Sequence, residues 1–248
     1  MKFHMLDSNS GKAVTALGLA LGLFANAYAA DIYTQDFEGV VGPEWSVSSV
    51  ATTPVGGRKF LGEFDNTSVA LSLAALPAHS TVSVEFDAFI IESWDGNGDA
   101  CCGPDIFDLS VVGGPAGLIH TTFSNHGPSF LNNQAYPGSY PGSSNPDTTG
   151  ATELDTLGYS LIGSASHTDA VYHLSATFAH SSAVIEFLFS ASGLQGIGDE
   201  SWGIDNVRVS VGVPDAGTGT ASLLSIAILA LAVTRLIRGD RAICSRLR

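Results

Sequence analysis

Short runs of β-branched and aromatic residues, separated by glycine, proline and asparagine, fill the chain between residues 31 and 213. In the clearest run, Thr81–Ile91, the apolar residues Val82, Val84 and Phe86 alternate with polar ones. This period of two is typical of a strand with one face in a core and the other in water. The region shows no helical period over a convincing length. The pattern therefore predicts an all-β fold.

About ten such runs are expected to be strands, enough for two sheets. Because no helix separates them, the sheets should pack face to face as a two-sheet jelly-roll sandwich. The predicted strands are Ile32–Phe37, Trp45–Val50, Lys59–Phe64, Ser68–Leu73, Thr81–Ile91, Ile106–Val112, Leu118–Ser124, Ala170–Ala179, Ala183–Ser190 and Gly203–Val211.

One long segment, residues 125–159, is dense in proline, glycine, serine and asparagine. Loops of this length in a compact domain are often functional or disordered. Tyr136 and Tyr140, each followed by Pro-Gly, are candidates for stacking on a sugar ring. The alternative is that they pack the loop onto the sandwich.

The N-terminus has the features of a secretory signal peptide over residues 1–29. Lys2 and Lys12 precede and flank an apolar run of suitable length, and Ala27-Tyr28-Ala29 gives a small-x-small cleavage pattern. We expect export through the Sec translocon, cleavage by signal peptidase and a mature start near Ala30. An uncleaved anchor helix is the alternative.

The C-terminus, residues 213–248, has a different organisation. A short polar motif, Val213-Pro214-Asp215-Ala216-Gly217, precedes the apolar run at 221–233. The apolar stretch extended to residues 216–234 is just long enough to span a membrane. The arginines beyond it indicate a cytoplasmic end, which leaves the rest of the chain outside the inner membrane. These arginines are Arg235, Arg238, Arg241, Arg246 and Arg248. The alternative is a buried C-terminal core helix.

This three-part tail resembles the PEP-CTERM class of bacterial sorting signals, in its VPDSG variant, with Ala216 in place of the usual serine. The resemblance implies that an exosortase, a membrane transpeptidase, cuts near the motif. It also implies that the protein passes from an inner-membrane-anchored intermediate to the cell surface or extracellular matrix.

Charge is unevenly distributed along the chain. The region 31–213 holds 21 acidic residues but only three basic ones, Arg58, Lys59 and Arg208, for a net charge of -18. Nucleic-acid binding needs clustered lysine and arginine, so this composition argues against it. The chain thus divides into a signal peptide, an acidic β-sandwich ectodomain at 30–212 and a sorting tail.

The strongest local signal for chemistry is the run Trp94-Asp95-Gly96-Asn97-Gly98-Asp99. Three oxygen-bearing side chains at alternate positions, with glycines that let the backbone curl, favour a Ca²⁺ site. The spacing does not match an EF-hand, and the nearby Asp105 is expected to complete the set. Trp94 is taken as a candidate ligand-binding residue. A solvated acidic turn is the alternative.

A second group of carboxylates lies at the two ends of the domain. Asp36 and Glu38 lie at the end of the first predicted strand, and Asp205 lies in the last. First and last strands of a sandwich are often neighbours, so Glu38 and Asp205 are predicted to share a cation that joins the ends. The pieces Asp-Phe-Glu at 36–38 and Trp-Gly-Ile-Asp-Asn-Val at 202–207 resemble the bookends of calcium-stabilised jelly-roll modules, many of them carbohydrate-binding. That resemblance implies a structural Ca²⁺ and a polysaccharide partner.

No enzymatic motif is convincing. Glu85-Phe86-Asp87 begins the E-x-D-x-x-E pattern of laminarinase-like glucanases, but the third carboxylate would fall at Ile90. The chain has no G-x-S-x-G elbow and no H-E-x-x-H motif. The adjacent Cys101 and Cys102 either form a vicinal disulfide or stay free. We therefore expect a non-enzymatic envelope protein that binds Ca²⁺ and glycans, with a polysaccharide-active hydrolase as the alternative.

Overall fold

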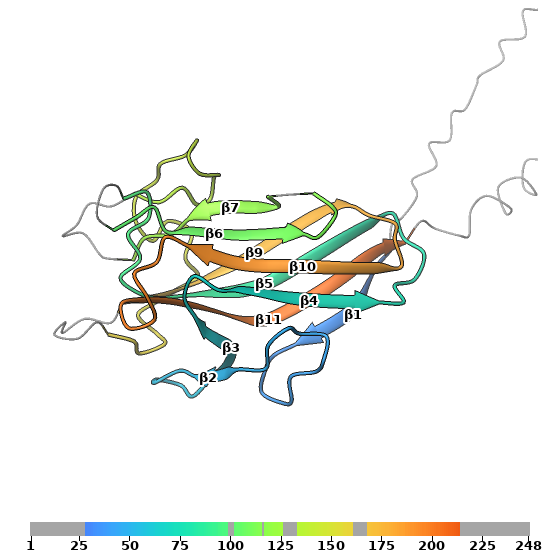
Figure 1. Ribbon diagram of the computed structural model, residues 1–248, viewed down its shortest axis with the longest axis horizontal. Helices are drawn as coiled ribbons and strands as arrows, with labels where there is room; N and C mark the ends of the chain where they lie inside the picture. The colour runs from blue at the N-terminus through green and yellow to red at the C-terminus, as the bar shows by residue number, and fades with distance from the viewer. Residues whose placement is uncertain (1–27, 99–101, 116, 126–132, 161–167, 214–248) are drawn as a thin grey trace, which may run out of the picture. The chain divides into compact units, whose positions relative to one another are not determined.

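The computed structural model describes residues 28–98, 102–115, 117–125, 133–160 and 168–213, and all of its regular elements there are strands. Figure 1 shows them as two layers. The strands are β1 (Tyr28–Gln35), β2 (Val50–Thr52), β3 (Lys59–Phe64), β4 (Ser68–Ala74), β5 (Thr81–Glu92), β6 (Ile106–Val111), β7 (Ile119–Thr122), β8 (Glu153–Leu154), β9 (Asp169–Ala179), β10 (Val184–Ser192) and β11 (Glu200–Val213).

The strands form a seven-stranded and a four-stranded sheet. The larger sheet has the order β2-β3-β11-β5-β9-β8, with β1 also paired to β11, and the smaller has the order β4-β10-β6-β7. Every strand pairing is antiparallel. The chain passes back and forth between the layers, since β3 and β5 belong to one sheet and β4 to the other. The predicted all-β, two-sheet jelly-roll sandwich is confirmed.

The first and last strands are neighbours, as expected. β1 runs antiparallel to β11, with Tyr28 opposite Val213 and Gln35 opposite Val207. Tyr28 and Ala29, which precede the expected mature start at Ala30, therefore belong to β1 here. The predicted sorting motif beyond Val213 and the predicted membrane span lie outside the described residues. Within those that are described, no helix has the length and apolar character needed to cross a membrane.

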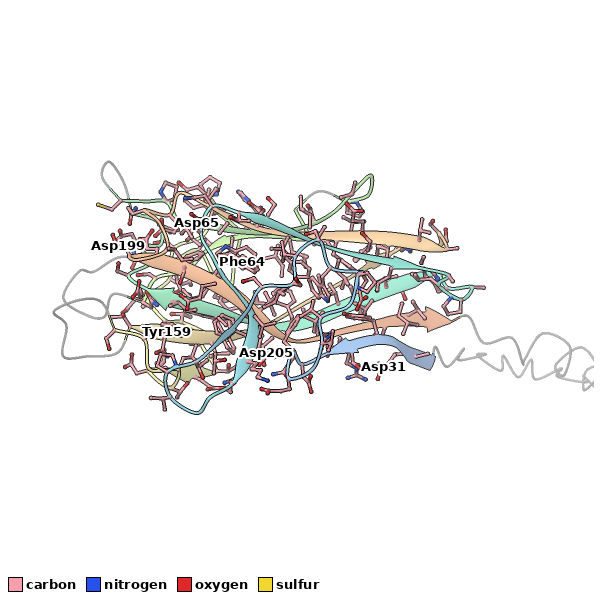
Figure 2. All side chains as sticks on the ribbon, turned by 60° about the horizontal axis from the view of Figure 1, so that its bottom comes forward. Asp31, Phe64, Asp65, Tyr159, Asp199 and Asp205 are labelled. Carbon is pink, nitrogen blue, oxygen red and sulfur yellow. The ribbon has the colours of Figure 1, made fainter. Side chains whose placement is uncertain are left out.

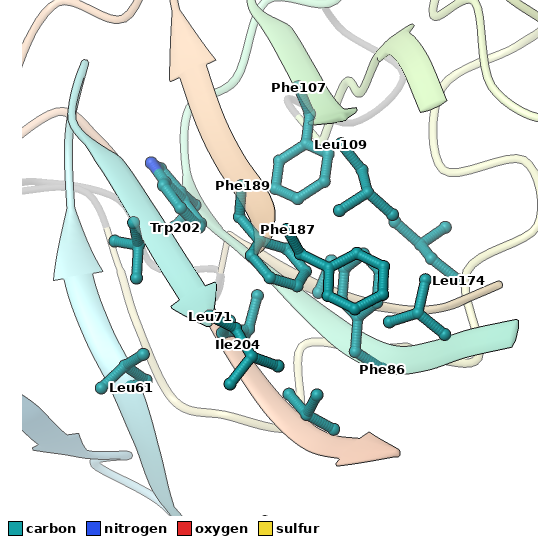
Figure 3. Close-up of a cluster of buried hydrophobic side chains, with 14 of the residues drawn as sticks. Leu61, Leu71, Phe86, Phe107, Leu109, Leu174, Phe187, Phe189, Trp202 and Ile204 are labelled. Atoms are coloured by element: carbon teal, nitrogen blue, oxygen red, sulfur yellow. The ribbon is translucent and has the colours of Figure 1, made fainter. Parts of the chain in front are cut away.

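The main core lies between the sheets. The alternation of β5 leaves Val82, Val84 and Phe86 fully buried. Phe86 meets Phe189 of the opposite sheet edge to face, with ring centroids 5.1 Å apart (Figure 3). Phe107 meets Trp202 in the same way at 5.5 Å. Such aromatic pairs add to the free energy of burial, so they bind the two layers together.

A second, smaller core covers the outer face of the larger sheet. Phe89 and Ile91 of β5 face away from the main core and pack with Phe60, Leu157 and Val171. These residues are at most 1% exposed. This end of β5 is thus buried on both faces, which explains why its alternation gives way to a continuous apolar run.

Two expected features of the strand pattern were wrong. The segment predicted as strand Trp45–Val50 is instead irregular and bonds to the edge of β4, through Ser46 N to Ala70 O at 2.9 Å. The strand in this region, β2, begins only at Val50. β8 was not predicted because two residues carry no periodicity.

Phe189 offers a direct test of the core. Its side chain is fully buried against Phe86 and Trp45, so Phe189→Ala should lower the free energy of unfolding by about 3–5 kcal/mol. The neighbouring Ser190→Ala, at a partly exposed position, should change it by less than about 0.5 kcal/mol. Urea unfolding measures both. Equal effects of the two substitutions would contradict this packing.

Candidate functional site

Three carboxylates from distant parts of the sequence meet at one end of the sandwich. Asp95 follows β5, Asp105 precedes β6 and Glu200 opens β11. One oxygen from each lies within 4.8 Å of the others, and the three residues are 9%, 0% and 0% exposed. Figure 2 shows Asp199, the neighbour of Glu200, at the opposite end of the sandwich from Asp31.

The backbone of two loops holds this acidic triad. The Asp95 amide donates to Asp105 Oδ2, and the Asp105 amide donates to the Gly96 carbonyl at 3.0 Å. The Gln195 amide donates to Glu200 Oε2 at 2.8 Å. The β5–β6 loop and the β10–β11 loop thus bring the carboxylates together through main-chain donors, without using a basic side chain.

Within the part of the chain that the structure describes, no lysine or arginine pairs with Asp105 or Glu200. The three basic side chains there bond elsewhere: Arg58 to Glu153 and Asp205, Lys59 to the Glu38 carbonyl, and Arg208 to Asp31. Asp105 Oδ1 and Glu200 Oε1 are buried without a hydrogen-bond partner. Unpaired buried carboxylate oxygens are costly, so this arrangement calls for a cation or for protons.

The pKa values of Asp105 and Glu200 reflect the free-energy cost of burying their negative charges. Burial raises the pKa of Asp105 to about 7 and that of Glu200 to about 9. Repulsion from Asp95 adds to the rise at Asp105, and repulsion from Asp105 and Asp95 adds to the rise at Glu200, because like charges disfavour ionisation of their neighbours. Hydrogen bonds to both carboxyls work in the opposite direction.

The donor set fits a hard divalent cation. Among the described residues it consists of carboxylate oxygens, and Ca²⁺ prefers oxygen ligands at about 2.3–2.6 Å. The three oxygens lie within 4.8 Å of one another, so a single ion at such distances can contact all of them. The buried triad can therefore hold a metal ion.

The ligands predicted in this loop do not all lie at one site in the structure. The fold brings Asp95 and Asp105 together. Asn97 points elsewhere: its Oδ1 accepts from Thr122 Oγ1 and its Nδ2 donates to Ser143 O. Asp99 lies outside the described residues. Glu200 was not predicted as a ligand, because nothing local in the sequence ties it to a loop about 100 residues earlier.

Glu38 and Asp205, which are predicted to share a cation, have separate protein partners in the structure. Asp205 is buried and forms an ion pair with Arg58, in which Oδ2 lies 3.6 Å from Nη2. Its Oδ1 accepts a hydrogen bond from the Asn206 amide. Glu38 accepts from the Lys59 amide at 3.0 Å, and Asp36 accepts from the Glu38 amide. The pairing of β1 with β11 joins the two ends of the domain, and the shared cation stays a prediction.

Trp94 is not a ligand-binding surface. It is fully buried, its Nε1 donates to the Ser201 carbonyl at 2.9 Å, and its ring meets Phe123 edge on. The residue instead anchors the start of the β5–β6 loop to β11. An indole beside a glycine-rich acidic loop looked accessible in the sequence, but the loop folds over it.

The two tyrosines have separate environments. Tyr136 packs against Phe123 and Tyr172 with centroids 5.2 and 5.3 Å apart, and its burial raises the pKa of its hydroxyl. Tyr140 is partly exposed and lies edge on to His120. A cleft of about 260 Å³ opens beside Tyr136, between β7 at the edge of the smaller sheet and β9 of the larger sheet. Its lining includes Leu118, Ile119, His120, Thr121, Tyr136, Pro137, Gly138, Ser139, His173, Leu174 and Ser175.

No family model matches the chain, and no curated protein matches it. Among solved structures, a carbohydrate-binding module of Cellvibrio mixtus lichenase 5A, in complex with cellotriose, is 15% identical with a TM-score of 0.33, covering 73% of this chain and 97% of that one. The C-terminal CBM6 of a Zobellia galactanivorans laminarinase is 12% identical with a TM-score of 0.33, covering 72% and 98%. An adhesin domain of the Porphyromonas gingivalis Lys-gingipain is 13% identical with a TM-score of 0.31, covering 73% and 98%. Likenesses this low assign neither a ligand nor an activity to this chain.

The raised pKa values predict how stability depends on pH when no metal is bound. Both carboxyls ionise near pH 4 in an unfolded chain, whereas Asp105 and Glu200 do so at about 7 and about 9 in the fold. Between these limits the folded state binds more protons than the unfolded state, so stability falls as pH rises. In EGTA, the melting temperature should therefore fall from pH 5 to pH 9.

The double variant Asp105→Asn, Glu200→Gln serves as the control, since neither replacement titrates. Its melting temperature in EGTA should fall much less over the same range. A wild-type melting temperature that stays level or rises from pH 5 to pH 9 would argue that the triad is not buried as described.

Proposed function

We propose that the protein is an exported, non-enzymatic β-sandwich module that is stabilised by a bound calcium ion and binds a polysaccharide. The observation that carries the proposal is the buried triad of Asp95, Asp105 and Glu200, with two carboxylate oxygens that have no partner. A divalent cation supplies the missing charge and the missing contacts together.

The burial of the triad also bears on catalysis. Glycoside hydrolysis needs two carboxyl groups that flank the sugar bond. The triad is at most 9% exposed, so a polysaccharide does not reach it. Glu85 and Asp87, which begin the glucanase-like pattern, are held on the outer face of β5 by Arg208 and by His173. These contacts support a structural role for both residues.

The cleft beside β7 and β9 is the proposed glycan-binding site. Its lining combines the Tyr136 ring with hydroxyl and imidazole groups, including Ser139, Ser175 and His120. A mixed set of hydrogen-bond donors and acceptors beside an aromatic ring suits a neutral sugar. No lysine or arginine is among its lining residues, which favours an uncharged ligand over an anionic one.

The proposed route to the surface rests on the two ends of the sequence. The signal peptide at 1–29 directs the chain to the Sec translocon and signal peptidase. The segment at 216–234 holds it transiently in the inner membrane, and an exosortase-type transpeptidase acts at the Val213–Gly217 motif. The product is carried on the cell surface or in the extracellular matrix.

Calcium should stabilise the fold through the triad. An ion present at 100 times its dissociation constant adds about 2.7 kcal/mol, which corresponds to roughly 5–11 °C in melting temperature for a domain of this size. We expect this rise when CaCl₂ replaces EGTA, and its loss in Asp105→Asn. Differential scanning calorimetry measures both.

Glu38→Gln is the matched control. It removes an acidic group that the sequence also suggested as a ligand but that lies on the surface, bonded to Lys59. Its calcium-dependent rise should equal that of the wild type. No rise in the wild type, or an equal loss in both variants, would rule out the triad as the calcium site.

Tyr140 tests the glycan site. Its ring lies edge on to His120, which lines the cleft. Tyr140→Ala should therefore weaken binding to a polysaccharide identified on a glycan array by about tenfold or more. The control is Val184→Ala, which changes an exposed residue at the start of β10, away from the residues that line the cleft. It should leave binding unchanged. Equal affinity of the two variants would show that the cleft is not the glycan-binding site. Turnover of the polysaccharide would favour the alternative function, a hydrolase.

A further inference from the structure

Asn97 lies between two of the triad ligands in the sequence but bonds to a different part of the molecule. Its amide donates to the Asn133 carbonyl at 2.6 Å, and its Nδ2 donates to the Ser143 carbonyl at 3.0 Å. Its Oδ1 accepts from Thr122 Oγ1. All three polar contacts of this residue thus join the β5–β6 loop to β7 and to the segment 133–145.

The segment 133–145, here called the tyrosine loop, has little regular structure of its own. Its internal order comes from an isolated bridge between Gln134 and Asn145 and from side-chain bonds to carbonyls. On the β7 side, Thr121 Oγ1 donates to the Gly138 carbonyl and the Tyr140 amide donates to the His120 carbonyl. Gln134 and Ala135 of this loop are fully buried, and Gln134 Oε1 accepts from the Ser124 amide and from the Tyr172 hydroxyl. Individual hydrogen bonds and buried side chains, rather than a strand ladder, therefore hold the loop.

The β5–β6 loop meets the tyrosine loop closely at a second point. Gly96 has a φ of 66°, and a Cβ there would collide with the Asn133 carbonyl and with Ser124. Only glycine therefore allows the two backbones to approach as they do. Asp95, on the other side of Gly96, forms an isolated bridge with Ser124. The residues that hold the triad and those that hold the tyrosine loop are thus consecutive.

The tyrosine loop also builds one wall of the cleft, since Tyr136, Pro137, Gly138 and Ser139 line it. Thr122, which donates to Asn97 Oδ1, accepts from the Ala135 amide through its hydroxyl and from the Tyr136 amide through its carbonyl. Hydrogen bonds thus link Asn97 to the start of this wall. When both carboxylates are ionised and no cation lies between them, Asp95 and Asp105 repel each other near the two ends of the loop that carries Asn97. The hydrogen bonds from Asn97 to the tyrosine loop are then no longer held in position by the β5–β6 loop.

We infer that occupancy of the acidic triad by a divalent cation orders the tyrosine loop through Asn97, and so controls whether the glycan-binding cleft is formed. This inference rests on the proposed function, because it takes the triad as a cation site and the cleft as the ligand site. Asn97 is a positioning residue in this scheme: it touches neither the cation nor the sugar.

The test is hydrogen–deuterium exchange of the full chain with CaCl₂ and with EGTA. Removal of calcium should speed exchange of amides in the tyrosine loop, such as Tyr136 and Tyr140, by at least about tenfold. Amides in the middle of β10, such as Phe187, should change far less. Asn97→Ala should show the fast exchange even in CaCl₂, while its calcium affinity by titration calorimetry stays within about threefold of the wild type.

Asn133→Ala is the matched control, because it removes an amide side chain of the same loop that bonds only to Ser144 Oγ among the residues described. Its exchange should remain calcium-dependent. Three outcomes overturn the inference. The first is calcium binding with no change in loop exchange, which leaves the calcium site intact. The second is a loss of calcium affinity in Asn97→Ala as large as in Asp105→Asn, which makes Asn97 a ligand. The third is no calcium binding to the wild type, which removes the proposed function as well.

Discussion

Burial of three carboxylates side by side is the constraint on which this end of the molecule depends. Asp95 and Asp105 lie in the loop between β5 and β6, and Glu200 is the first residue of β11. Packing and main-chain hydrogen bonds force them together, and the electrostatic cost of that arrangement is large in a dry site. A bound cation converts the same geometry from a source of repulsion into a link between the loops.

The rest of the sandwich explains why such a site is tolerated. The aromatic core between the sheets, in which Phe107 meets Trp202 edge to face and Phe86 packs at a tilt against Phe107, stabilises both layers through buried apolar contacts. The pairing of β1 with β11 closes the domain where the chain enters and leaves it. The loops at the triad end can therefore depend on an ion while the strands beneath them hold their register.

Sequence periodicity predicted the fold class well and the site only in part. β3, β5 and β9 are long enough for their patterns to be read, and their predicted bounds differ from the observed ones by at most one residue. Asp95 and Asp105 were accessible to prediction because they lie close together in the sequence. Glu200 was not, because its place beside them is set by the antiparallel pairing of β11 with β5.

The errors share one physical origin. Asn97 and Trp94 have side chains that suit a ligand, yet both make their hydrogen bonds to protein groups. Asp205 has a partner in Arg58, far away in the sequence. Local spacing shows which polar groups a side chain has. Long-range contacts decide whether those groups bind a ligand or bond to another part of the chain.

Native mass spectrometry of the chain, purified in the presence of calcium, tests the central claim most directly. The account predicts one calcium ion for the triad, removed by EGTA and absent from a variant that carries Asp105→Asn and Glu200→Gln. A wild-type chain that carries no metal, or a double variant that carries as much calcium as the wild type, would contradict it.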